Sequence, residues 1–298
     1  MIISIIISGD KMYILLVFIV ISIFVIYVVI DNRRIKVKRQ EINLGNTGKS
    51  IKILQISDLH SKVLRNADYI KINALKYDVV AFTGDTFVNE DKEYTSIIEF
   101  MKKVNNTKVV LYVDGNNGTK AYNRKDNTLT DFGNKLEKMG IIVLKDKYEI
   151  NSVIFTNYNA ITSKILDNDW HGKYKIYSKL SNEMKKSNDL SIGLAHFPLD
   201  KNAIELVNKK NIYYIPDLII AGHLHGGQIR LPFIGALIIP KSTGGFKLFP
   251  EPKLVCGLYE EGKVKQYISR GVGATKHIKL LAFRLFNTPE VDLIDVKY

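Results

Sequence analysis

Five short apolar segments rich in β-branched residues most strongly limit the folds that this chain can adopt. Each of them is followed directly by a cluster of polar residues. Longer segments of helical periodicity separate most of these segments, which argues for an α/β architecture. Polar side chains that follow such strands gather at one edge of a sheet, where α/β proteins bind their ligands. The expected strands are 51–57, 78–83, 108–113, 190–195 and 217–221, and the expected helices are 66–76, 93–104, 129–139 and 203–209.

The polar residues after these strands are of metal-binding types. Only six histidines occur in the chain, and four of them follow a strand. One such histidine is ordinarily a core residue, but four together with two aspartates and an asparagine indicate a metal site. The predicted ligands are Asp58, His60, Asp85, Asn116, His196, His223 and His225.

The residue types and their spacing favour a pair of ions. Imidazole and carboxylate ligands suit Mn, Fe, Zn or Ni. Residues i and i+2 of an extended chain share a face, so Asp58 and His60 can reach the same ion. The spacing recurs at His223 and His225, and Asp85 on its Gly-Asp turn is placed to bridge two ions. Such a pair clamps a phosphate and lowers the pKa of a bridging water.

The order D-x-H, G-D, G-N-x, H, G-H-x-H resembles the signature of the calcineurin-like metallophosphoesterases. The chain is most similar to their membrane-associated bacterial branch, which includes UDP-diacylglucosamine pyrophosphatase-like enzymes that cleave the diphosphate of acylated UDP-sugars. The branch carries S-D-x-H and G-H-x-H-G-G-Q, present here at 57–60 and 222–228, and closing segments like 269–273 and 287–290. The resemblance covers about residues 51–298.

The resemblance implies a four-layered α/β/β/α sandwich with its motifs on loops at one end. It also implies an enzyme, a binuclear phosphoesterase whose metal-activated hydroxide cleaves a phosphoester or phosphoanhydride bond. Mn is one of the metals expected. One ion is then held by Asp58, His60, Asp85 and His225, and the second by Asp85, Asn116, His196 and His223.

The chain departs from the family pattern at Asn117, where a catalytic histidine is usual. An asparagine donates a hydrogen bond but supplies no proton near neutral pH. One interpretation is a pyrophosphatase, because a phosphate leaving group with a pKa of about 6 needs little protonation. The alternative is a weak or silent membrane-bound module that binds metal or ligand. His171 and His277 are the other histidines that could replace the missing acid.

An uncharged apolar run at 12–30 is long enough to cross a bilayer, at about 1.5 Å per residue. It lacks the small-residue cleavage site of a signal peptide and the polar face of a core helix. We expect a single-pass anchor over 1–30, a basic linker over 31–50 and the catalytic domain over 51–298. The linker's positive charges predict a cytoplasmic catalytic domain at the cell membrane. The alternative is an ordinary basic linker before a periplasmic or extracellular domain.

The formal net charge of +13 fits an anionic, phosphate-containing and possibly lipid-linked substrate. We expect no nucleic-acid partner, because no recognition helix, zinc finger or aromatic-basic interleaving occurs. With one cysteine, the chain has neither an internal disulfide nor a Cys-based zinc site. Gln228 and Arg230 are candidate substrate contacts. The apolar, Gly-rich stretch 231–248 is either a membrane-contacting flap or an ordinary hairpin.

Overall fold

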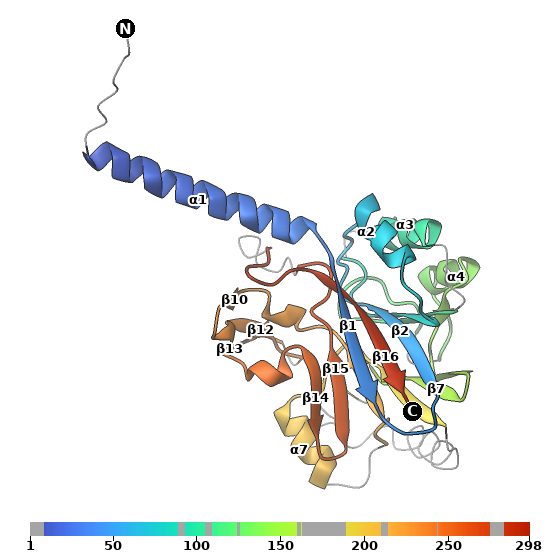
Figure 1. The fold of residues 1–298 in the computed structure, drawn as a ribbon. Helices are drawn as coiled ribbons and strands as arrows, with labels where there is room; N and C mark the ends of the chain where they lie inside the picture. The colour runs from blue at the N-terminus through green and yellow to red at the C-terminus, as the bar shows by residue number, and fades with distance from the viewer. Residues whose placement is uncertain are drawn as a thin grey trace.

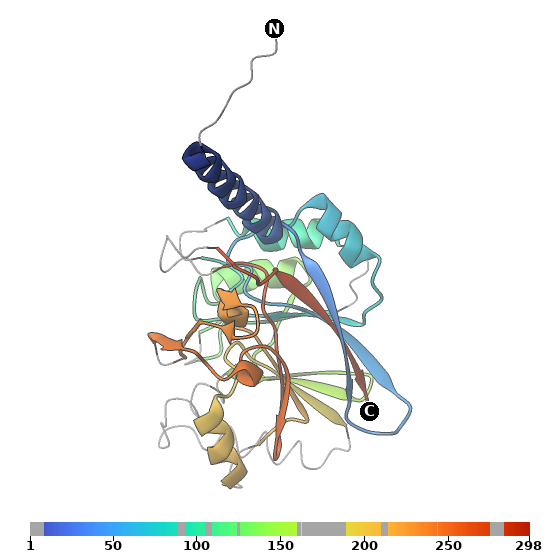
Figure 2. The ribbon, with the colours of Figure 1, turned by 60° about the vertical axis from the view of Figure 1, so that its left-hand side comes forward.

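The computed structural model describes residues 9–88, 93–104, 109–123, 126–159, 162, 189–209, 214–242, 244–274 and 283–298. Two six-stranded sheets stack face to face (Figures 1 and 2). In order across the first sheet lie β1 (Lys36–Asn43), β16 (Glu290–Lys297), β2 (Ser50–Ile56), β3 (Val79–Thr83), β4 (Val109–Val113) and β5 (Ile142–Val143). In order across the second lie β14 (Gly257–Glu261), β15 (Val264–Ile268), β9 (Leu218–Ala221), β8 (Leu190–Leu194), β7 (Val153–Asn157) and β6 (Lys147–Ile150).

The central strands of both sheets are parallel. In the first sheet β2, β3, β4 and β5 pair in parallel, while β16 pairs antiparallel to β2. In the second sheet β15, β9, β8 and β7 pair in parallel between two antiparallel edge strands. Because β3, β4, β8 and β9 are buried along their whole length, they read as continuous apolar runs in the sequence.

Three apolar clusters hold the layers together, and they confirm the expected α/β/β/α sandwich. The middle cluster lies between the sheets and includes Leu111 and Ile192. The outer face of the first sheet packs against helices that contribute Ile72, Phe100 and Leu136. Ile204 packs on the outer face of the second sheet. The helices are α2 (Asn66–Asn73), α3 (Thr95–Lys103), α4 (Asp131–Lys138) and, over the second sheet, α7 (Lys201–Lys209).

Helix α1 (Gly9–Arg33) projects away from the sandwich (Figures 1 and 2). Its segment Lys11–Arg33 is long and apolar enough to cross a membrane, and an 18-residue stretch within it has a mean hydropathy of 3.2 and no buried residue. The expected linker over 31–50 is wrong in part, because Lys36–Asn43 forms β1 and pairs in parallel with β16 along its whole length. The polar strand was missed because its partner lies at the other end of the chain.

Two small hairpins lie beside the second sheet. β10 (Arg230–Leu231) pairs with β11 (Gly235–Ala236), and β12 (Ile238–Pro240) pairs with β13 (Phe246–Leu248). Short 3-10 turns, η1 (His225–Gly227) and η2 (Pro252–Leu254), flank them. Most of the stretch 231–248 is therefore hairpin, and its only residue outside the described part of the chain is Thr243.

Candidate metal centre

The loops after β2, β3, β4, β8 and β9 meet at one end of the sandwich. Backbone hydrogen bonds tie them to one another: Asp58 donates to Gly84, and His60 donates to Asp85, at N···O distances of 3.1 and 3.0 Å. Between the sheets, the backbone N–H of His223 donates to Oδ2 of Asp58 at 3.0 Å. All seven predicted ligands therefore lie at this one end, and six of them form two compact groups.

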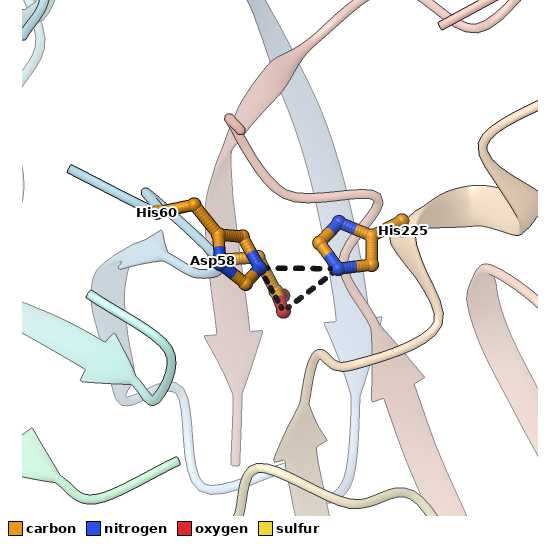
Figure 3. Close-up of side chains that lie close together, drawn as sticks. All are labelled: Asp58, His60 and His225. Carbon is orange, nitrogen blue, oxygen red and sulfur yellow. Dashed lines mark hydrogen bonds and ion pairs between the residues drawn. The ribbon is translucent and has the colours of Figure 1, made fainter. Parts of the chain in front are cut away.

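The first group consists of Asp58, His60 and His225 (Figure 3). The Nε2 atoms of the two imidazoles lie 3.2 Å apart, and Oδ1 of Asp58 lies 3.6 Å from Nε2 of His225. Oδ1 is fully buried and has no hydrogen-bond partner in the described part of the chain. Because Ser57 and the backbone of His223 both donate to Oδ2, the carboxylate is held with its free oxygen toward the two histidines.

The second group consists of Asp85, His196 and His223, with Asn116 beside it. Nε2 of His196 lies 3.2 Å from Nδ1 of His223 and 2.8 Å from Oδ1 of Asn116. On the other side of the ring, Nδ1 of His196 lies 3.0 Å from the carbonyl oxygen of Thr83. That carbonyl fixes the ring so that Nε2 faces the group, as the outer partners of metal-binding histidines do.

Asp85 lies between the two groups. Its Oδ2 is 3.7 Å from Nε2 of His60 and 3.4 Å from Nε2 of His196. One carboxylate oxygen thus faces a histidine of each group, which is the position of a bridging ligand. The donor set fits divalent cations, because a buried oxygen without a partner costs free energy that a cation would remove.

The electrostatics of the site agree with this geometry. Burial lowers the pKa of His60 and His225, which leaves both rings in the neutral form that binds metals. Burial and the charge of His196 lower the pKa of His223 to about 3. Burial alone would also lower the pKa of His196, but the charges of Asp85 and Asp58 and the hydrogen bonds to the ring together outweigh it and raise that pKa to about 9. The proton on His196 stands where a bound cation would neutralise the carboxylate.

Five of the predicted ligands hold backbone conformations that non-glycine residues rarely adopt. Each such conformation costs about 1–3 kcal/mol and persists only where the surroundings enforce it, typically at functional sites. These conformations belong to sharp turns that direct the five side chains toward the same site. The positive φ angles are 53° at Asp58, 46° at His60, 47° at Asp85, 70° at His223 and 51° at His225.

Asn117, which replaces the usual histidine, contacts the bridging carboxylate. Its backbone N–H donates to Oδ1 of Asp85 at 2.7 Å, and its side-chain Nδ2 donates to Oδ2 at 2.6 Å. In this structure Asn117 therefore orients Asp85. Its neighbour Asn116 is exposed and contributes its amide oxygen to the second group.

The predicted substrate contacts Gln228 and Arg230 support the turn that carries His225. Nη1 of Arg230 donates to the carbonyl oxygen of Gly226 at 2.7 Å. Gln228 is buried, and its carbonyl oxygen accepts from the backbone of Leu285 at 3.1 Å. Trp170, His171 and His277 lie outside the described residues.

Sequence reasoning missed Arg284, a fully buried cation behind the first group. Its Nη1 donates to the carbonyl oxygen of His225 at 3.3 Å, and its Nη2 lies 3.5 Å from Nδ1 of the same residue. Its backbone exchanges two hydrogen bonds of 2.7 Å with the side-chain amide of Asn32, at the end of α1. No local pattern reveals Arg284, although the nearby family-like segment 287–290 pointed to this region, since Asn287 also donates to His225.

A family model described as calcineurin-like phosphoesterase matches residues 51–227. The chain belongs to this family. Members use divalent metals, and the two groups of ligands support metal-dependent hydrolysis of phosphoesters.

Curated relatives agree with this assignment. The phosphoesterase is 28% identical over 257 residues to the uncharacterized metallophosphoesterase YkuE of Bacillus subtilis, covering 83% of this chain and 79% of the relative. It is 26% identical over 287 residues to the uncharacterized metallophosphoesterase Cj0846 of Campylobacter jejuni, covering 94% and 68%. A solved structure, the phosphopantetheinyl hydrolase PptH of Mycobacterium tuberculosis, is similar with a TM-score of 0.38 and 13% identity, covering 74% of this chain and 89% of that one.

A cavity of about 490 Å³ opens beside the second group of this phosphoesterase. The metal-site residue on its wall is His223, and most of the rest comes from residues 198–202 at the start of α7, from the β12–β13 hairpin and from residues 250–254. Lys201, Lys241 and Lys247 line it together with Asp200 and Glu251, which leaves a formal excess of one positive charge. Because the cavity is adjacent to the ligands, a substrate group held in it lies next to the metal site.

Proposed function

We propose that this protein is a membrane-anchored hydrolase of phosphoester or phosphoanhydride bonds that works with two divalent ions. The observation that carries the proposal is the shared carboxylate: Oδ2 of Asp85 faces a histidine of each group, at 3.7 and 3.4 Å. When bound, such ions polarise the phosphoryl oxygens and lower the pKa of an attacking water.

The chain's own residues hold this arrangement. Ser57 and the backbone of His223 fix Asp58, the carbonyl of Thr83 fixes His196, and Asn117 fixes Asp85. The lysines of the adjacent cavity attract the remaining negative charge of the substrate. Binding and orientation of a phosphate group are therefore built into side chains that are already in place.

Asn117 supports a diphosphate substrate. It donates hydrogen bonds to Asp85 and has no acidic proton for a leaving group. A leaving phosphate has a pKa of about 6 and departs without protonation, whereas an alkyl alcohol does not. We propose a nucleotide-linked or lipid-linked diphosphate as the substrate, in line with the branch that the motifs resemble.

The membrane anchor belongs to the same proposal. The apolar part of α1 is exposed and of spanning length, and it is followed by a single acidic residue, Asp31, and by five basic ones: Arg33, Arg34, Lys36, Lys38 and Arg39. Positive charge beside a span favours the cytoplasmic side. The catalytic domain then lies in the cytoplasm, against the inner membrane surface.

A hydrolysis screen of the full chain in detergent tests the proposed function. We expect Mn-dependent turnover of bis(p-nitrophenyl) phosphate and of diphosphates. We expect Asp85→Ala to abolish both, because removing the shared carboxylate breaks both groups. If no phosphodiester or diphosphate is hydrolysed in a metal-dependent way, the proposed hydrolase function is wrong and the protein only binds metal or ligand.

Asn117→His tests the choice of substrate. A restored proton donor should speed cleavage of an alkyl phosphoester by about 10²-fold or more, the usual worth of general acid catalysis. A diphosphate should gain much less. An equal gain on both substrates contradicts the diphosphate assignment.

A further inference from the structure

Large apolar side chains are exposed on the two hairpins beside the metal site and on two neighbouring loop residues, Phe249 and Phe286. Among the described residues outside α1, the other exposed large apolar side chains are Val63 and Ile70, and Ile70 lies on α2. Phe233 at the β10–β11 turn is fully exposed. We call the group the hairpin surface; it comprises Phe233, Ile234, Phe246, Leu248, Phe249 and Phe286.

The hairpin surface is continuous with the end of α1. The ring of Phe286 lies 6.2 Å from that of Phe24 and 6.0 Å from that of Tyr27, measured between centroids. The preceding residue, Leu285, pairs with Ile229 just before β10. In both views the hairpins lie on the side of the sandwich from which α1 leaves (Figures 1 and 2).

Three of the exposed aromatic residues have a left-handed backbone conformation. Phe233, Phe249 and Phe286 have φ angles of 68°, 45° and 48°, which bulky residues rarely adopt. Strain of this kind persists where it serves a function.

Charge around the hairpin surface suits an anionic bilayer. Residues 228–254 contain four basic side chains and one acidic side chain, Glu251. Apolar rings flanked by basic residues are the pattern of proteins that lie at a membrane surface, where each basic residue near anionic lipid contributes about 1 kcal/mol. The basic residues are Arg230, Lys241, Lys247 and Lys253.

We propose that the hairpin surface docks on the bilayer that α1 crosses and inserts its aromatic rings among the lipid headgroups. This inference rests on the membrane anchor of the proposed function. The β12–β13 hairpin forms both part of the hairpin surface and part of the wall of the cavity beside His223. Docking places the mouth of this cavity at the headgroup level, so the diphosphate of a membrane lipid reaches the metal site without leaving the bilayer.

Tryptophan fluorescence in vesicles tests the docking independently of catalysis. The full chain has one tryptophan, so Trp170→Phe provides a silent background. Phe233→Trp is placed in this background, with Ile70→Trp, 70% exposed on α2, as the matched control. Both are reconstituted in phosphatidylcholine vesicles containing phosphatidylglycerol, with or without lipids that carry a nitroxide near the headgroup.

We expect the nitroxide lipids to quench the tryptophan at position 233 severalfold more than the one at position 70. Equal quenching at the two positions overturns the docking. So does a blue-shifted emission at position 233 that depends on protein concentration and not on the nitroxide, because a second copy would then cover the surface.

A double variant, Phe233→Ser with Phe249→Ser, connects docking to substrate use. We expect a severalfold loss of turnover on a diphosphate lipid in the vesicles and no change on soluble bis(p-nitrophenyl) phosphate. An equal loss on both substrates contradicts the role in substrate access. If no substrate is turned over but quenching is observed, docking stands and the proposed function fails. If turnover is observed without quenching, the proposed function stands and docking fails.

Discussion

At the scale of single residues, glycines decide how closely the ligands approach one another. A side chain on Gly222 would place its Cβ 1.8 Å from Oγ of Ser57 and 2.5 Å from Oδ2 of Asp58. The hydrogen bond from Oγ of Ser57 to Oδ2 of Asp58 holds the Asp58 carboxylate in place. The absence of a side chain at position 222 is therefore part of the metal site.

We expect Gly222→Ala to reduce metal-dependent hydrolysis by about 100-fold, because a displacement of roughly 1 Å in a catalytic group costs this much. Overpacking should also lower the unfolding free energy by about 1–3 kcal/mol. Gly45→Ala is the matched control, since its Cβ would come no closer than 3.3 Å to any neighbour. Kinetics and thermal melts of both variants check this prediction. Equal activities would show that the absence of a side chain at position 222 does not determine the position of the Asp58 carboxylate.

The convergence of the predicted ligands at one end of the sandwich could be predicted from sequence, whereas the residues that orient them could not. Asp58, Asp85 and His196 directly follow apolar strands, so local pattern places them at one edge. Arg284 follows no such pattern, because its partner His225 is 59 residues away. The contact of Asn117 with Asp85 could not be predicted either, because these residues are 32 positions apart in the sequence and only the fold brings them together.

At the scale of elements, the central strands were predictable and the edges were not. The strands predicted over 51–57 and 108–113 are observed as Ser50–Ile56 and Val109–Val113, because buried parallel strands are uniformly apolar. β1 has a charged sequence, KVKRQEIN, which lacks that signal. Its place in the sheet depends on β16, so only the folded chain reveals it.

β16 carries a buried carboxyl group that makes stability depend on pH. Burial and the charge of Glu290 raise the pKa of Asp292 to about 7 from 3.8, while Tyr267 and Ser269 donate hydrogen bonds to its oxygens. The folded state therefore holds a proton that the unfolded chain releases.

We expect the unfolding free energy to fall as pH rises from about 4 to about 7, with a contribution from Asp292 of up to ~1.4 kcal/mol per pH unit. The sign follows because the folded state binds more protons than the unfolded state in this window. Asp292→Asn should remove this part of the slope. Urea unfolding across the window measures it, and an unchanged slope would contradict the assignment.

At the scale of the whole molecule, α1 is connected to the metal site. Its last turn carries Asn32, which holds the backbone of Arg284, and Arg284 in turn contacts His225. Oγ1 of Thr288 donates to the buried Asp31 at 2.7 Å and strengthens the same junction. Side-chain hydrogen bonds thus join the end of the helix directly to the catalytic domain, and part of the predicted basic linker forms β1.

Asn32→Ala in the full chain should therefore weaken metal binding about 10-fold or more, as the loss of outer partners of metal ligands typically does. It should also lower the unfolding free energy by about 1–3 kcal/mol through two lost hydrogen bonds. Gln40→Ala is the control, because this exposed amide donates only to its neighbour Glu41. Mn titration compares the two variants. Equal Mn affinities would show that the junction between α1 and the catalytic domain does not affect metal binding.

The central claim is that Asp85 lies between two divalent ions. A crystal of the Mn-loaded protein, measured at the Mn absorption edge, tests it directly. We predict two anomalous peaks about 3.5–4 Å apart, one at Asp58, His60 and His225 and the other at His196, His223 and Asn116, with the Asp85 carboxylate touching both. A single peak, or a pair that Asp85 does not join, would contradict the account.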